Sequence, residues 1–194
     1  MPPSDPAGDH RPAGRRGGEV TVELRDLEFY DDDDTAVLLL EATRLNVNWT
    51  GEERVDDAGV LADRSLAHYT VLHPGRGDFG LVAEIGGRAV GVVWLLFLDA
   101  SDPGYGYVAD GVPELSVCVW PGYRGVGIGR LLLEEAFLAA RKRDIRRVSL
   151  SVENGNPATR LYRDVGFSDA TGSAPGTISR RPSGLRKTIR APNS

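Results

Sequence analysis

The sequence is poor in features that mark several large classes of protein. It has one cysteine, Cys118, in 194 residues, so no disulfide can form within the chain, and we expect a reducing, cytoplasmic setting. Its longest apolar run, Ala89 to Leu98, is far shorter than the about 20 residues that a membrane-spanning helix needs. The N-terminus also lacks the apolar core of a signal peptide. We therefore expect no membrane partner.

A basic excess and a metal-binding pattern are also missing. Asp and Glu number 28 against 23 Lys and Arg, which gives a net charge of −5. This balance argues against a general nucleic-acid binder, which neutralises phosphates with cationic side chains. The histidines His10, His68 and His73 do not have the spacing of a metal site. We predict neither a nucleic-acid partner nor a bound metal.

The length of the chain predicts one domain, which we assign to residues 19–194. Residues 1–18 are rich in Pro and Gly and almost free of apolar side chains, which predicts a disordered N-terminal tail. The acidic run Asp31 to Asp34 is typical of the start of a helix. Residues 99–112 are predicted to form a long surface loop.

Hydrophobic periodicity predicts the remaining elements. We expect helices over 35–46, within 56–69 and over 128–143, and strands within 20–29 and over 78–85, 88–98, 114–120 and 147–153. Segments 177–179 and 185–189 are weaker candidates for closing strands, because Gly, Pro and Arg interrupt them.

The most informative segment lies between Glu114 and Phe167. A strand ends near Trp120, and Arg-Gly-Val-Gly-Ile-Gly at 124–129 then opens directly into an amphipathic helix. The glycines remove Cβ atoms that would block a ligand, and the first N–H groups of a helix have no partner inside it. The helix dipole and the charges of Arg124 and Arg130 add to the attraction for an anion. The segment therefore predicts a pyrophosphate-binding loop.

This segment resembles the acetyl-coenzyme A (acetyl-CoA) site of the GNAT superfamily of N-acyltransferases. The phosphate loop of that family runs Arg or Gln, two residues, Gly, one residue, and Gly or Ala, and Arg124, Gly127 and Gly129 occupy these positions. A second family motif follows, because Asn156-Pro157-Ala158 opens a short helix that carries Tyr162. The resemblance implies an α/β fold with a mixed, mostly antiparallel sheet of six or seven strands, flanked by helices and splayed where the coenzyme enters.

The resemblance also implies the reaction, in which acetyl-CoA is the co-substrate and an amine-bearing acceptor attacks it directly in a ternary complex. Glu114 is the candidate base for the amine, with Asp110 in reserve, and Tyr162 is the candidate acid for the departing thiolate. Backbone N–H groups around 117–119 would stabilise the carbonyl oxygen. The candidate coenzyme-binding residues are Val117, Cys118, Val119, Arg124, Gly125, Val126, Gly127, Ile128, Gly129, Arg130, Asn156, Ala158 and Tyr162.

From the sequence alone, purely structural roles explain several of these residues as well as the functional roles do. Glu114 fits a solvated carboxylate at a strand end, Tyr162 a core tyrosine, Asn156 a helix cap and Cys118 a small core residue. The aromatic residues are compatible either with a surface for a cationic amine or with ordinary packing. These are Trp49, Trp94, Tyr105 and Tyr107.

Two other functions stay open at this point. One is a coenzyme-binding module without turnover. The other is a dinucleotide-binding oxidoreductase in which Glu153 binds a ribose, although its fingerprint G-x-G-x-x-G differs from the spacing at 125–129. The sequence also leaves open a homodimer, the length of the acyl group and the identity of the acceptor.

Overall fold

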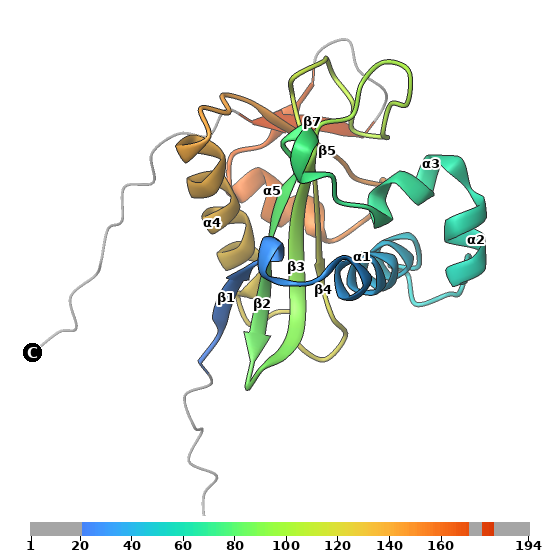
Figure 1. The fold of residues 1–194 in the computed structure, drawn as a ribbon, viewed down its shortest axis with the longest axis vertical. Helices are drawn as coiled ribbons and strands as arrows, with labels where there is room; N and C mark the ends of the chain where they lie inside the picture. Colours follow the sequence, from blue (N-terminus) through green and yellow to red (C-terminus); the bar gives the residue numbers. More distant parts are fainter. Residues whose placement is uncertain (1–20, 171–175, 181–194) are drawn as a thin grey trace, which may run out of the picture.

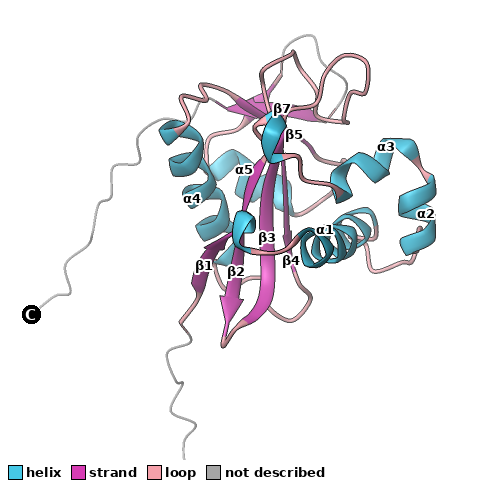
Figure 2. Ribbon diagram, in the orientation of Figure 1, coloured by secondary structure: helices cyan, strands magenta, loops and turns pink. Residues whose placement is uncertain are grey.

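The computed structural model describes residues 21–170 and 176–180, and it shows one sheet with helices on both faces (Figures 1 and 2). The elements in chain order are β1 (Glu23–Asp26), η1 (Leu27–Phe29), α1 (Asp32–Val47), α2 (Asp57–Ala62), α3 (Arg64–Ala67), η2 (His68–Thr70), η3 (Pro74–Arg76), β2 (Phe79–Ile85), β3 (Arg88–Leu96), β4 (Glu114–Val119), α4 (Ile128–Lys142), β5 (Val148–Ser151), α5 (Ala158–Asp164), β6 (Ser168–Asp169) and β7 (Thr177–Arg180).

The seven strands form a single sheet in the order β1-β2-β3-β4-β5-β7-β6. Every neighbouring pair is antiparallel except β4 and β5, which are parallel. The predicted α/β fold with a mixed, mostly antiparallel sheet is therefore confirmed, and the described residues form seven strands of it.

Two hydrophobic clusters cover the two faces of this sheet. The first joins α4 and α5 to β2, β3, β4, β5 and β7, and the second joins α1 and η2 to the opposite face of β2, β3 and β4. Side chains of β3 alternate between them, because Val93 belongs to the first and Trp94 to the second. β3 is thus buried on both sides, as its continuous apolar run predicts.

Helix starts follow the local signals in the sequence. The side chain of Asp31 caps α1 by accepting a hydrogen bond of 2.8 Å from the N–H of Asp34, so the acidic run does begin a helix. α4 buries Ile128, Leu132 and Ala136, which are spaced four residues apart and face the sheet.

Some predicted boundaries differ from the structure. β1 stops at Asp26, because Leu27 turns into the core and the N–H of Tyr30 closes a tight turn on its carbonyl. The helix expected within 56–69 is broken at Asp63, whose side chain caps α3. The predicted tail 1–18 and the closing strand 185–189 lie outside the described residues.

None of the helices in the described ranges combines the length and the apolar character that crossing a bilayer requires.

Candidate active site

The parallel strands β4 and β5 touch only at one end. Their ladder holds the single pair Glu114 and Ser149, next to a hydrogen bond of 3.1 Å from the N–H of Ser149 to the carbonyl of Pro113. After this point β4 continues along β3, while no further pairing joins it to β5 in the described residues. A split therefore opens in the middle of the sheet, from Leu115 onward.

The direction of the N–H groups along β4 follows from its pairing with β3. The N–H of Trp120 donates to the carbonyl of Val90 at 2.9 Å, and in an antiparallel pair the groups facing the partner alternate along the strand. The N–H of Cys118 therefore faces β3. Those of Val117 and Val119 face the split, where β5 does not pair with them.

A cleft of about 560 Å³, which we call the main cleft, opens at this split. Four predicted site residues line it together, although they come from three separate segments of the chain. They are Glu114, Val117, Asn156 and Tyr162. Trp49, Trp94 and Tyr105 line it too, whereas Tyr107 does not.

Glu114 lines the main cleft and is buried, with 4 % of its surface exposed. Its Oε1 atom accepts hydrogen bonds from the hydroxyl of Tyr69 at 2.7 Å and from the N–H of Gly106 at 2.8 Å. Its Oε2 atom is buried without a hydrogen-bond partner in the described part of the chain. Burial raises the pKa of Glu114 to about 7, while the two donors oppose this rise. The alternative of a solvated strand-end carboxylate is therefore wrong.

The reserve candidate, Asp110, has a different environment. It accepts a hydrogen bond of 2.7 Å from the hydroxyl of Tyr107, an exposed pair on the loop that precedes β4, and it does not line the main cleft. The structure thus separates two carboxylates that lie four residues apart in sequence.

Tyr162 lies on α5 and is 9 % exposed. Burial raises the pKa of its hydroxyl to about 12, so the group keeps its proton at neutral pH. Its ring packs edge-on against Phe167, with the ring centroids 6.0 Å apart. Tyr162 is therefore a core tyrosine that also reaches the main cleft.

The glycine-rich loop adopts a backbone conformation that only glycine accepts readily. Gly125 and Gly127 have φ angles of +80° and +96°, and the space beside each α-carbon is open. Gly127 precedes α4, and no side chain within residues 21–170 and 176–180 caps the N–H groups of this helix end. A Cβ atom on Gly129 would lie 3.3 Å from Leu161, so this third glycine allows α4 to pack closely against α5.

The other residues of the loop point in different directions. The Nε of Arg124 donates to the carbonyl of Val119 at 2.8 Å, and Arg130 pairs with Asp164 at 3.4 Å. Ile128 packs in the core, so only its backbone faces outward, while Val126 is 73 % exposed. The Arg124 hydrogen bond holds the loop against the end of β4, whereas the Arg130 ion pair links α4 to α5.

Asn156 and Cys118 also have visible structural roles. The side-chain oxygen of Asn156 accepts a hydrogen bond of 2.9 Å from the N–H of Ala158, the first residue of α5. Cys118 packs in the cluster that covers the α1 face, and burial raises the pKa of its thiol to about 12. Its side chain is a core residue, as expected, and does not line the main cleft.

Comparison with known proteins identifies the family. Residues 44–167, more than half of the chain, match the model of the acetyltransferase (GNAT) family. The chain is a GNAT acetyltransferase. The oxidoreductase alternative is therefore wrong.

Several known proteins are similar to this acetyltransferase over most of their length. A candidate ribosomal protein bS18-alanine N-acetyltransferase of Bacillus subtilis (strain 168) is 25% identical over 176 residues, covering 90% of this chain and 91% of that protein. A GNAT acetyltransferase of Staphylococcus aureus Mu50 superposes with a TM-score of 0.61 at 17% identity, over 84% and 100% of the two chains. The yncA protein of Salmonella typhimurium, solved with acetyl-CoA, has a TM-score of 0.56 at 24% identity, over 90% and 99%.

Sequence reasoning missed two cleft residues of the acetyltransferase, Tyr69 and Arg54. It also missed that Trp49, Arg54 and Glu153 form a polar cluster, in which Trp49 Nε1 donates to Glu153 and Arg54 pairs with the same carboxylate at 3.1 Å. These hydrogen bonds, first that of Trp49, lower the pKa of Glu153. About a hundred residues separate Glu153 from its partners, so no local pattern could have revealed the cluster.

Proposed function

We propose that this acetyltransferase transfers an acetyl group from acetyl-CoA to a primary amine, by direct attack within a ternary complex. The observation that carries the proposal is the pairing of two groups in the main cleft. Glu114 has a pKa near 7 and can accept a proton, and Tyr162 stays protonated and can donate one. Both line the main cleft, as does Val117 of β4.

In this proposal the coenzyme lies along the split. Its pyrophosphate binds the N–H groups of residues 125–130 at the start of α4, and its pantetheine arm passes Val117, Val119 and Asn156. The positive φ angles of Gly125 and Gly127, the uncapped start of α4 and the open space beside both glycines support this placement. The solved structure of the Salmonella typhimurium protein with acetyl-CoA supports the choice of ligand.

The chemistry then uses each group once. The neutral amine attacks the thioester carbonyl, a C–N bond forms, and the carbonyl oxygen takes negative charge, which the N–H groups of Val117 and Val119 stabilise. The tetrahedral intermediate then collapses, which breaks the C–S bond. The nitrogen gives up a proton to Glu114, and the leaving thiolate takes one from Tyr162. The products are the N-acetylated acceptor and coenzyme A.

For the acceptor, we propose the α-amine of a peptide or protein. The Bacillus subtilis relative is named for an alanine of ribosomal protein bS18, and alanine has no side-chain nitrogen, so its acceptor atom is an α-amine. At pH 7 about one α-amine in six is neutral, against about one lysine side chain in 2,500. A base with a pKa of about 7 suits the first kind of amine better.

The test is release of free thiol from acetyl-CoA, measured across matched acceptors. An Ala-initiated peptide, the same peptide with a blocked N-terminus and one lysine, free alanine and a polyamine would be compared. We expect turnover mainly with the unblocked peptide and a rate lowered by about 100-fold or more in Glu114→Gln. Tight binding of acetyl-CoA without thiol release for any acceptor would instead indicate a coenzyme-binding module without turnover.

A further inference from the structure

Glu114 sits in a cage that treats its two oxygens differently. Both donors that reach the carboxylate bind Oε1, whereas Oε2 is buried and has no partner among the described residues. A carboxylate oxygen that accepts hydrogen bonds stabilises the ionised form, and an oxygen without donors is the better place for an added proton. The cage therefore distinguishes a held oxygen from a free one.

The hydrogen bond from Tyr69 has a fixed direction. The Tyr69 oxygen accepts a hydrogen bond of 2.8 Å from the N–H of Tyr105, and a backbone N–H can only donate. The single hydroxyl proton of Tyr69 is thus committed to Glu114. Burial raises the pKa of Tyr69, so this proton stays in place at neutral pH.

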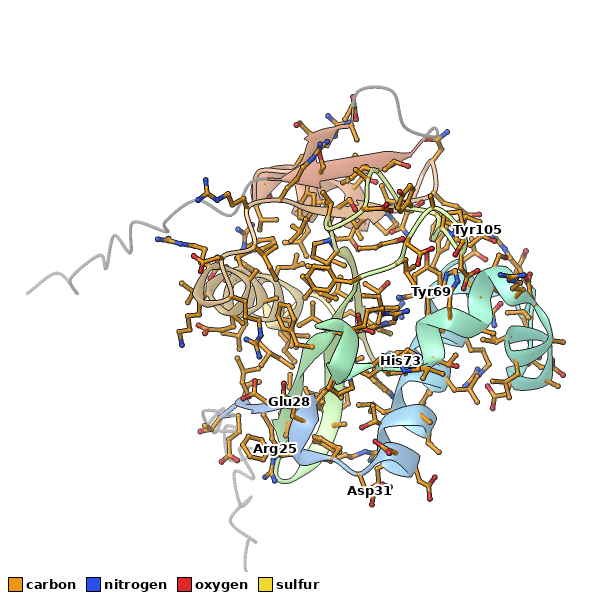
Figure 3. All side chains as sticks on the ribbon, turned by 45° about the horizontal axis from the view of Figure 1, so that its top comes forward. Arg25, Glu28, Asp31, Tyr69, His73 and Tyr105 are labelled. Carbon is orange, nitrogen blue, oxygen red and sulfur yellow. The ribbon has the colours of Figure 1, made fainter. Side chains whose placement is uncertain are left out.

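The position of Tyr69 is itself held by packing. It lies on η2 with 7 % of its surface exposed, its ring stacks parallel to that of Tyr105 with centroids 6.5 Å apart, and His68 packs edge-on at 4.4 Å. Figure 3 labels Tyr69 and Tyr105, which lie together at the same end of the molecule.

Two glycines complete the cage. A Cβ atom on Gly104 would lie 2.0 Å from Glu114 Oε2 and 2.6 Å from the Tyr69 hydroxyl, and one on Gly106 would lie 2.8 Å from Glu114 Oε1. Any other residue at these positions would push the carboxylate or the loop away. The loop before β4 is therefore shaped around Glu114.

Other ionisable groups of the main cleft are engaged elsewhere. Glu153 on the β5–α5 loop pairs with Arg54, and Asp63, before α3, accepts hydrogen bonds from Ser65. In the described residues, no hydrogen bond or ion pair links them, or Tyr162 on α5, to Glu114. Among the described side chains, the Tyr69 hydroxyl is thus the group that can set the orientation and the pKa of Glu114.

We propose that Tyr69 is a positioning residue of the reaction, which keeps Glu114 ionised and oriented so that Oε2 accepts the proton of the acceptor amine. The proposal rests on the proposed role of Glu114 as base. Tyr69 does not itself exchange a proton with the substrate.

The test compares the pH dependence of kcat/KM for wild type, Tyr69→Phe and Tyr107→Phe. Wild-type activity falls toward low pH as Glu114 becomes protonated. Losing one donor to the carboxylate should shift this acid limb upward by about one pH unit in Tyr69→Phe. Tyr107→Phe removes an exposed hydroxyl outside the cleft and should leave the limb in place. A lower rate in Tyr69→Phe without a shifted limb would show a packing role only and overturn the proposal.

Two further variants separate the possible failures. In Glu114→Gln, residue 114 no longer titrates, so any remaining fall of kcat/KM at low pH comes from protonation of the acceptor amine. If the pH profile of Glu114→Gln matches that of wild type, Glu114 is not the base, and both proposals are wrong. If the acid limb changes in Glu114→Gln but not in Tyr69→Phe, only the positioning role of Tyr69 is wrong. If Tyr69→Phe does not fold, 3-fluorotyrosine at position 69 keeps the shape and strengthens the donor. It should shift the limb to lower pH, and an unchanged limb would overturn the proposal.

Discussion

Replacing Glu114 by glutamine should change how stability depends on pH. Burial raises the pKa of Glu114 from 4.5 to about 7, so the folded state binds this proton more tightly than the unfolded state does. This tighter proton binding adds to the free energy of unfolding. The added stability is fully present below pH 4.5 and is lost as the pH rises through about 7. At about 1.4 kcal/mol per pH unit, the loss is about 3 kcal/mol.

Glutamine has nearly the same shape and stays neutral, and its side-chain oxygen can still accept the hydrogen bonds of Tyr69 and Gly106. The variant should therefore gain about 3 kcal/mol relative to wild type between pH 4.5 and pH 8. Carboxylates whose pKa is lowered, such as Asp63 and Glu153, titrate equally in both proteins and cancel in the difference.

Urea unfolding of both proteins at closely spaced pH values measures this difference directly. The slope should be steepest between pH 5 and pH 7, where the folded protein holds a proton that the unfolded chain has released. A constant difference across the whole range would refute the reasoning, because it would mean that Glu114 ionises as easily when folded as when unfolded.

Three other substitutions test the site. Gly104→Ala places a Cβ 2.0 Å from Glu114 Oε2 and should lower kcat about 100-fold and stability by about 1–3 kcal/mol. The control is Gly75→Ala, where the added Cβ would have no neighbour within 4 Å among the described residues outside its own turn. Equal rates for both variants would contradict the proposed packing of Gly104 against Glu114. Tyr162→Phe should lower kcat by about 100-fold to 10,000-fold and leave the calorimetric Kd for acetyl-CoA unchanged, and a parallel loss of both would defeat its role as acid. Gly127→Ala forces a side chain into a φ of +96°, which costs about 1–2 kcal/mol, so coenzyme binding should weaken; a Kd equal to that of wild type would argue against the phosphate loop.

Local features of this protein were predictable because their partners are neighbours in sequence. Asp31 caps the helix that begins at the next residue, and the glycines at 125–129 run directly into α4. The same holds for Asn156, whose side chain binds the N–H of Ala158 two residues later. Boundaries failed where distant packing decided them, as at Leu27, which leaves the path of the strand to enter the core.

The sequence by itself determined the family, the order of most elements and the glycine-rich loop, since these depend on periodicity and on contacts within a few residues. Only the tertiary structure decided which of two neighbouring carboxylates is buried and lines the main cleft. Glu114 and Asp110 look alike in sequence, but Tyr69, 45 residues away, reaches Glu114 and removes it from water together with Gly104 and Gly106. Burial and hydrogen bonding set a pKa, and both arise from segments that meet only when the chain folds.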